Sequence, residues 1–200
     1  TQYRTHPSIS DFPNNRFYDG KLEDGVDRSD REAPAGMLWP DWDAPLAFLP
    51  VEGEELLSPD GASKENSVEA SWVVKILMGL IEEGGLEFSS IGIITPYAGQ
   101  VRAIRDMIPE SMQDVEVRTV DGYQGREKDV IIFSCVRSNP YGNVGFLSDR
   151  RRLNVALTRS RRGLIVVGNP ETLRHDDNWR AWIDHIRSSK LEAWHLLGTA

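Results

Sequence analysis

The sequence predicts an α/β fold, in which a mostly parallel sheet carries helices on both faces. Short apolar runs alternate with segments whose apolar residues recur at helical spacing. Two runs, Ile91–Thr95 and Leu164–Val167, are apolar throughout their centres, which is typical of strands buried on both faces. Helices between successive strands supply the crossovers that parallel pairing needs. The length of 200 residues fits a single domain over residues 1–200.

The N-terminal segment indicates one short helix and one strand. Pro7 opens a helix over Ser8–Phe12, and we expect Pro13 to end it because proline cannot donate to the helical ladder. Asp27–Pro45 is polar and rich in Pro, Gly and Trp, which predicts a surface excursion. Leu46–Val51 is apolar and indicates a strand.

A loop and a long helix follow this strand. Glu52–Ser67 is rich in Gly, Ser, Pro and Glu, and we expect it to be the most mobile part of the chain. Asn66 or Ser67 can cap a helix that runs to about Glu83, where two glycines stop it.

The C-terminal half alternates strands and helices. Glycine, asparagine and proline in Ser138–Ser148 indicate a loop between them. In chain order the expected elements are a strand over Ile91–Thr95, a helix over Gln100–Met107, strands over Val115–Val120 and Asp129–Val136, a helix over Arg151–Arg159, a strand over Leu164–Val167 and a helical stretch over Asn178–Lys190.

Composition bounds the class of protein. The chain is 40% hydrophobic and 27% charged, with a net charge of −8, which argues against nucleic-acid binding by the whole surface but allows a local basic track. No apolar stretch approaches the ~18 residues of a membrane span.

The chain has a single cysteine, Cys135, which excludes an intrachain disulfide. Cys135 fits a small buried hydrophobe in a reducing compartment, so we expect a cytoplasmic or nuclear protein. A start at Thr1 rather than Met suggests a fragment.

Arginines cluster in one segment, Arg151–Asn169, with the sequence RRLNVALTRSRRGLIVVGN. Arg152 and Arg159 lie seven residues apart and fall on nearly the same helical face, away from Leu153 and its apolar neighbours. A helix that presents arginines and then leads into a central strand is suited to hold a polyphosphate.

Polar and aromatic residues follow the predicted strands. Thr95, Pro96 and Tyr97 end one strand, and the stretch from Asp121 to Glu127 follows the next. Ligands of an open parallel sheet gather at the carboxyl ends of its strands, so we expect both groups to lie there. Taken singly, each group also fits an ordinary turn.

Four segments together resemble consecutive helicase motifs of superfamily 1. The form is similar to the second RecA-like domain of superfamily 1B, up-frameshift-type RNA helicases that act in nonsense-mediated decay. The matching segments are QYRTHPSIS (Gln2–Ser10), IGIITPYAGQ (Ile91–Gln100), TVDGYQGREKDVIIFSCVRSN (Thr119–Asn139) and RRLNVALTRSRRGLIVVGN (Arg151–Asn169). The resemblance implies a RecA-like three-layer sandwich of the P-loop NTPase type, with an AAA-type nucleotide cleft.

The resemblance also implies an ATP site. Tyr3 matches the tyrosine that lies against the base, and Arg4 and Arg159 match arginines that reach the γ-phosphate. Gly125 and Glu127 match a glycine and a glutamate beside the nucleotide, with the glutamate near the ribose. A finger arginine can contribute ~10³–10⁵ in rate because it offsets charge that develops on the transferring phosphoryl group.

Five further residues match the nucleic-acid track of this family: Thr95, Pro96, Tyr97, Thr119 and Asp121. The implied partner is single-stranded RNA, with single-stranded DNA left open because backbone contacts read little of the sugar or base. We expect no membrane partner and a monomer.

No phosphate loop of the form G-x-x-x-x-G-K-[ST] and no acidic pair for magnesium occurs in the chain. In the resembling helicases both belong to a preceding RecA-like domain, which would be the main holder of the Mg²⁺ ion that accompanies ATP. We therefore expect this chain to form one half of an ATPase and to be inactive on its own. The alternatives are a helicase-like scaffold module without catalysis and a DNA-directed helicase or helicase–nuclease.

Several other features have simpler interpretations. The four histidines are scattered and predict no metal site. We expect His6 to be structural, and Trp179, Trp182 and Trp194 to serve packing rather than base stacking. Arg152 is expected to pair with acidic surface residues rather than to act as a finger.

Overall fold

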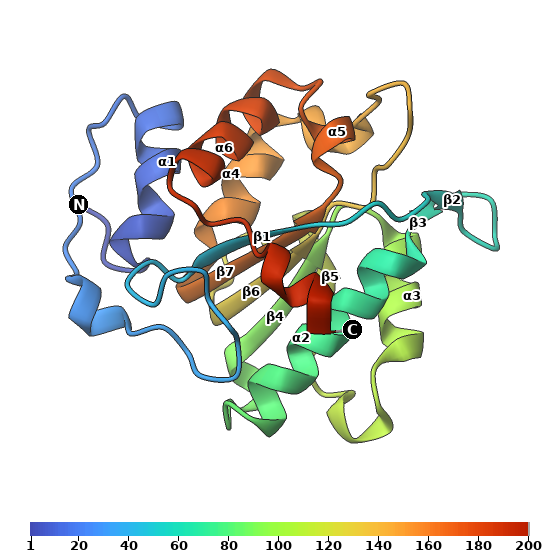
Figure 1. The fold of residues 1–200 in the computed structure, drawn as a ribbon, viewed down its shortest axis with the longest axis horizontal. Helices are drawn as coiled ribbons and strands as arrows, with labels where there is room; N and C mark the ends of the chain where they lie inside the picture. Colours follow the sequence, from blue (N-terminus) through green and yellow to red (C-terminus); the bar gives the residue numbers. More distant parts are fainter. Residues whose placement is uncertain (200) are drawn as a thin grey trace.

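A computed structural model describes residues 1–199 of the chain. Its five-stranded sheet has the order β1–β7–β6–β4–β5, and every pairing in it is parallel (Figure 1). The strands are β1 (Leu46–Pro50), β4 (Ile91–Thr95), β5 (Glu116–Thr119), β6 (Lys128–Ser134) and β7 (Ser160–Gly168). The predicted parallel sheet is therefore confirmed.

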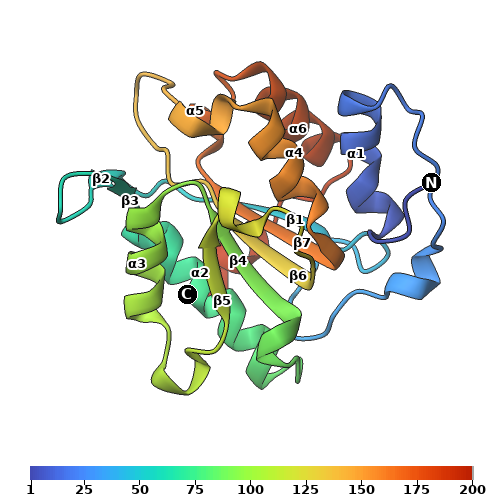
Figure 2. The same cartoon turned by 180° about the vertical axis from the view of Figure 1, so that it is seen from behind.

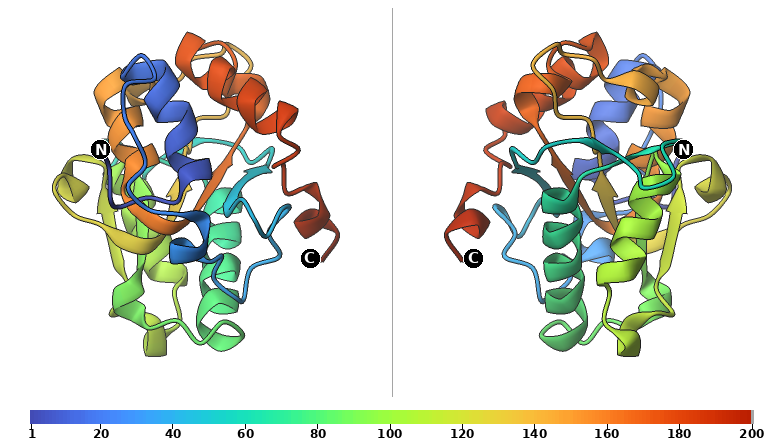
Figure 3. Two further views of the ribbon diagram at one scale, coloured as in Figure 1. Left: turned by 90° about the vertical axis from the view of Figure 1, so that its left-hand side faces the viewer. Right: turned by 90° about the vertical axis from the view of Figure 1, so that its right-hand side faces the viewer.

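Helices cover both faces of this sheet. One face carries α1 (Pro7–Phe17), α4 (Arg150–Thr158) and α6 (Asp177–Ser188), and the other carries α2 (Ser67–Glu82) and α3 (Ala98–Met107) (Figure 3). Seen from behind, α3 lies beside β5 at the edge of the sheet (Figure 2). This arrangement of three layers confirms the predicted RecA-like α/β class.

Short elements complete the chain. A small antiparallel hairpin joins β2 (Leu56–Leu57) to β3 (Lys64–Glu65), and α5 (Pro170–Leu173) precedes α6. Short 3₁₀ helices lie at η1 (Arg28–Arg31), η2 (Phe88–Ser90), η3 (Glu110–Met112), η4 (Asp121–Tyr123), η5 (Gly145–Ser148) and η6 (Trp194–Thr199). No helix of the described residues combines the length and the apolar character that a membrane crossing requires.

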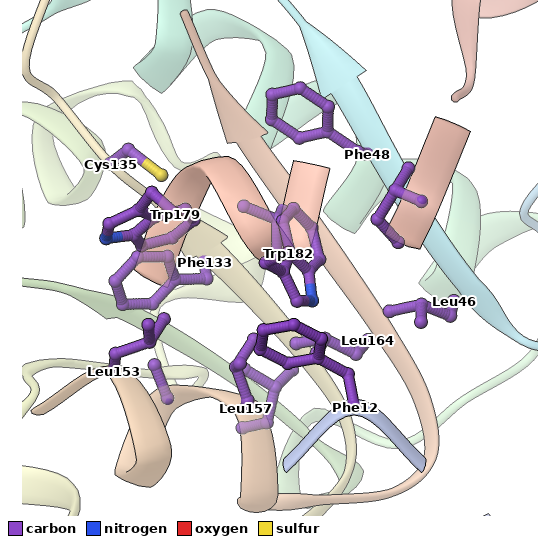
Figure 4. Packing of buried hydrophobic residues seen from close by; sticks show 14 of the residues in the cluster. Phe12, Leu46, Phe48, Phe133, Cys135, Leu153, Leu157, Leu164, Trp179 and Trp182 are labelled. Carbon is purple, nitrogen blue, oxygen red and sulfur yellow. The ribbon is translucent and has the colours of Figure 1, made fainter. Parts of the chain in front are cut away.

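Aromatic rings fill the core between the sheet and α6 (Figure 4). Trp179 stacks on Phe133 of β6 with ring centroids 6.1 Å apart, and its indole nitrogen donates to the carbonyl of Leu147. Trp182 packs edge-on against Phe48 of β1. The packing roles of Trp179 and Trp182 and the buried position of Cys135 are confirmed, whereas Trp194 is 54% exposed and its packing role stays a prediction.

Two helix and strand boundaries differ from prediction. Helix α1 continues through Pro13 to Phe17, because its buried face, which includes Ile9, Phe12 and Pro13 itself, is anchored in the core. Tertiary packing here outweighs the lost backbone hydrogen bond. Strand β7 begins at Ser160, earlier than the apolar run indicates, because Ser160 pairs with Lys128 of β6.

Two segments predicted as surface or loop contain ordered parts. Within the predicted surface excursion, Met37 and Trp39 are buried, and the Trp39 indole donates to the carbonyl of Pro34 at 2.8 Å. The surface prediction is therefore wrong for these residues, since single large apolar side chains in a polar segment show no periodicity. The predicted loop before α2 contains the β2–β3 hairpin.

Candidate functional site

The connection between β5 and β6 separates the predicted site residues into two groups. It carries only η4 and passes β4, which lies between the two strands. Tyr123 in this connection is fully buried, and its hydroxyl lies directly against Gly92 of β4. Asp121 therefore stays at the carboxyl end of β5, whereas Glu127 reaches the amino end of β6. The expectation that both lie at the carboxyl ends is wrong, because β5 and β6 are parallel and the chain must return to the amino end before β6 begins.

Arg159 lies at the amino end of β7, where α4 ends. Asp149 caps the start of α4 by accepting from the backbone N–H groups of Arg151 and Arg152. At the other end, the Arg159 Nη2 donates to the Thr158 hydroxyl at 3.1 Å. This helix thus places Arg159 at the amino end of the inner strand β7.

The Arg159 guanidinium is only partly neutralised. Its Nε is buried and has no hydrogen-bond partner among residues 1–199, and no carboxylate of these residues forms an ion pair with it. Burial lowers the pKa of Arg159, and the positive charge of Arg4 lowers it further. An arginine in this setting gains from an incoming anion, because an unsatisfied buried donor is costly.

Arg4 lies beside Arg159 although the two are far apart in sequence. Its Nη1 donates to the Thr158 carbonyl at 3.1 Å, and its Nε forms an ion pair with Glu127. Arg31 donates to the carbonyls of Tyr3 and Arg4 and fixes their backbone. The Tyr3 side chain is 68% exposed, so its ring is free to meet a ligand.

A cavity of about 250 Å³ joins the predicted nucleotide residues. Tyr3, Arg4 and Arg159 line it together with Tyr18 and Thr158. The structure therefore brings together three residues that the sequence places at opposite ends of the chain.

Gly125 and Glu127 lie outside this cavity. Gly125 has a φ of 74°, which explains why glycine stands there, and no described atom lies within 4 Å of a Cβ built on it. Glu127 pairs with Arg4 through one oxygen and with Arg161 through the other, at 2.6 Å to Nη2. Burial alone would raise the pKa of Glu127, but hydrogen bonds from Arg161 and Arg4 lower it. The carboxylate is thus ionised and shared by two arginines.

A second cavity of about 440 Å³ opens at the carboxyl ends of β4 and β5. Four of the five predicted nucleic-acid residues, Pro96, Tyr97, Thr119 and Asp121, line it. Thr95 is fully buried, and its hydroxyl has no partner among the described residues. The structure therefore brings four of the five to one surface and leaves Thr95 beneath it.

Several residues of this second cavity were not predicted from the sequence. Phe146 of η5 is 53% exposed and lies 5.2 Å from the Tyr97 ring, between centroids. The Arg152 guanidinium lies 5.1 Å from the Phe146 ring and 3.3 Å from the Asp121 carboxylate, which confirms its predicted acidic partner. The signal available for Phe146 was a large aromatic side chain within a Gly- and Asn-rich loop.

No group of three or more His, Cys, Asp or Glu side chains within residues 1–199 is arranged to hold a metal ion. His6 serves the structure as expected, since its Nδ1 accepts from the Ser8 N–H and caps α1.

The parallel sheet with helices on both faces, with one cavity lined by arginines at the amino ends of the strands and another lined by aromatic and acidic side chains at the carboxyl ends, defines a protein of the RecA-like α/β class. Residues 1–171 match the model of the AAA domain family, and the chain belongs to this family. The chain is 44% identical to regulator of nonsense transcripts 1 of Dictyostelium discoideum over 95% of its length and 15% of the relative's.

Two further relatives are named as helicases. The chain is 44% identical to ATP-dependent helicase upf1 of Schizosaccharomyces pombe, covering 93% of this chain and 21% of that protein. It is 41% identical to ATP-dependent helicase NAM7 of Saccharomyces cerevisiae, covering 93% and 20%. The chain thus spans about a fifth or less of the length of these relatives.

Proposed function

We propose that this chain is the second RecA-like domain of a longer ATP-dependent helicase that moves on single-stranded nucleic acid, with RNA as the substrate. Two relatives carry the name ATP-dependent helicase and others the name regulator of nonsense transcripts 1, which supports a role in nonsense-mediated decay. This chain covers only 15% and 21% of two of these relatives, which leaves room for the further RecA-like domain that the proposal requires.

The observation that carries this proposal is the arginine pair at the first cavity. Arg4 and Arg159 stand side by side, and Arg159 has no acidic partner among residues 1–199. Glu127 already pairs with Arg4, so the uncompensated positive charge at this cavity is that of Arg159, and an incoming anion would offset it. A γ-phosphate fits this requirement, because its oxygens accept several hydrogen bonds from planar guanidinium groups.

In this proposal the domain forms one wall of an ATP cleft. Tyr3 lies against the base, and Arg4 and Arg159 reach the γ-phosphate from this side. The preceding domain supplies the phosphate loop and holds the Mg²⁺, which neutralises phosphate charge when bound. Positioned arginines stabilise the charge that develops on the transferring phosphoryl group, and their loss of contact after hydrolysis lets the two domains separate.

The second cavity serves as this domain's half of the nucleic-acid track. Pro96, Tyr97, Thr119 and Asp121 would contact the strand, and Thr95 would support them from beneath. Because domain closure follows the nucleotide, the two domains grip the strand alternately and move along it. We expect a monomer in the cytoplasm or nucleus, without a membrane partner.

The proposal is tested with the complete protein and with the 200-residue chain alone. We expect the complete protein to hydrolyse ATP faster when single-stranded RNA is added, and the chain alone to show no stimulated hydrolysis. Stimulation by single-stranded DNA but not by RNA would assign a DNA-directed enzyme. A complete protein without ATP hydrolysis would contradict the proposal and favour a scaffold module.

A further inference from the structure

The carboxyl end of β6 bends sharply directly behind the second cavity. Val136 has a φ of 72°, a left-handed conformation that β-branched residues rarely adopt. The buried carboxylate of Glu69 in α2 accepts from the Val136 N–H at 2.9 Å and from the Ser134 hydroxyl at 2.8 Å. The Asn66 amide donates to the Val136 carbonyl at 3.0 Å. Side chains of the α2 start thus hold this strained residue through both its backbone polar groups.

The strained bend sets the direction of the next side chain, Arg137. Arg137 is 7% exposed, and its Nε lies 3.1 Å from the Glu55 carboxylate. Its Nη1 donates to the Tyr97 hydroxyl at 3.1 Å. Glu55 is fixed in turn by the Ser138 N–H at 2.9 Å. A buried cation therefore connects a buried acid to an aromatic residue of the cavity wall.

The backbone of η5 closes over this connection. Gly145 has a φ of 54°, and a Cβ there would overlap the Arg137 Nη1 and lie 2.6 Å from the Tyr97 hydroxyl. Only glycine permits this approach. The next residue, Phe146, packs on the Tyr97 ring. The Arg137–Tyr97 hydrogen bond is therefore enclosed between β6, α3 and η5.

We propose that Arg137 is a positioning residue for nucleic-acid binding, which holds the buried Tyr97 ring, 6% exposed, beneath the exposed Phe146 ring that an unpaired base or sugar meets. This inference rests on the proposed function, because it assigns the second cavity to the strand. The alternative is that Arg137 only neutralises Glu55. Burial lowers the pKa of Arg137, but the Tyr97 and Glu55 contacts outweigh it and raise that pKa, so the guanidinium stays charged.

A double-mutant cycle separates these roles. Tyr97→Phe removes only the hydroxyl, and Arg137→Lys keeps the charge beside Glu55 but loses the fork that reaches Tyr97. The affinity of the complete protein for a fluorescent single-stranded RNA is measured without nucleotide. We expect each single change to weaken binding about five- to tenfold, because the Tyr97 and Phe146 side chains are then no longer fixed before RNA binds and must be ordered on binding. The double variant should bind no more weakly than either single variant.

Arg187→Lys is the matched control. Arg187 of α6 is half-buried and pairs with Glu192 at 3.3 Å, away from the second cavity, so its replacement should leave RNA affinity unchanged. Thermal unfolding of each variant shows that the compared proteins are folded at the assay temperature.

Three outcomes are informative. Additive losses in the double variant would show that Tyr97 and Arg137 act independently and would overturn the inference. Wild-type affinity in Arg137→Lys would show that Arg137 only neutralises Glu55, and this result would also overturn the inference. A wild-type protein that binds no single-stranded RNA or DNA would instead overturn the proposed function.

Discussion

The Arg4 guanidinium donates a hydrogen bond of 3.1 Å to the backbone carbonyl of Thr158, the residue that immediately precedes Arg159. This contact joins the first residues of the chain to the end of α4. It explains how two arginines separated by most of the sequence come to line one cavity. The Arg4 side chain is held at its other edge by Glu127, so its orientation is defined before any nucleotide arrives.

Glu127→Gln should slow ATP hydrolysis in the complete protein. Both oxygens of Glu127 are engaged by arginines, so the neutral amide would release Arg4 from its position. Misplacing one catalytic group by about an ångström can cost up to ~100-fold in rate. We expect turnover of ATP and of 2′-deoxy-ATP to fall about ten- to a hundredfold alike. A change confined to the ratio between these two nucleotides would instead indicate that Glu127 contacts the ribose directly.

Gly92→Ala should destabilise the domain. A Cβ at Gly92 would overlap the Tyr123 hydroxyl and lie 3.0 Å from Ile131. Overpacking of this kind costs roughly 1–3 kcal/mol in the free energy of unfolding, measured by urea denaturation. Gly122→Ala, where the nearest atom lies 3.4 Å from the new Cβ, serves as the control. Adding Tyr123→Phe should restore part of the loss, because it removes the closest overlapping atom, which has no partner among the described residues, but leaves the ring carbon 2.9 Å from the new Cβ. No rescue would contradict this packing.

Much of the sheet was predictable because burial on both faces leaves a direct trace in the sequence. The cores of β4, β6 and β7 are continuous apolar runs, and few other structures produce them. Helix α4 was equally predictable, since its apolar residues repeat at helical spacing.

The division of the site into two ends was predictable in principle, but it was overlooked. In a parallel sheet the chain must return from the carboxyl end of β5 to the amino end of β6, and Glu127 directly precedes β6. Phe146 was missed for a different reason, since an exposed aromatic residue in a loop shows no periodicity. The roles of Tyr3, Arg4 and Arg159 came from family resemblance, and the geometry adds that they share one cavity.

The stability of the domain should depend on His6 at mildly acid pH. Burial, with a smaller contribution from the Arg28 charge, lowers the pKa of His6 from its ordinary 6.5 to about 4. Its neutral Nδ1 must accept from the Ser8 N–H. The unfolded chain therefore takes up a proton that the folded chain resists, and the free energy of unfolding should fall as pH drops from about 6.5 to about 4.

His6→Asn tests this dependence, because asparagine can still cap α1. Relative to this variant, the wild type should lose roughly 2–3 kcal/mol of unfolding free energy across that range. His175→Asn is the control: because His175 is exposed, this variant should show the same fall in unfolding free energy with pH as the wild type. Identical pH profiles for wild type and His6→Asn would show that His6 is not the titrating group.

The role of Arg159 is the central claim of this account, and turnover by Arg159→Ala tests it most directly. Removing the guanidinium leaves developing phosphoryl charge uncompensated, and finger arginines contribute ~10³–10⁵ in rate. In the complete protein with saturating single-stranded RNA, we expect kcat for ATP to fall by about 10³-fold or more. RNA affinity without nucleotide should match the wild type, because Arg159 lies at the opposite end of the strands from the second cavity. A kcat equal to that of the wild type would contradict the assignment.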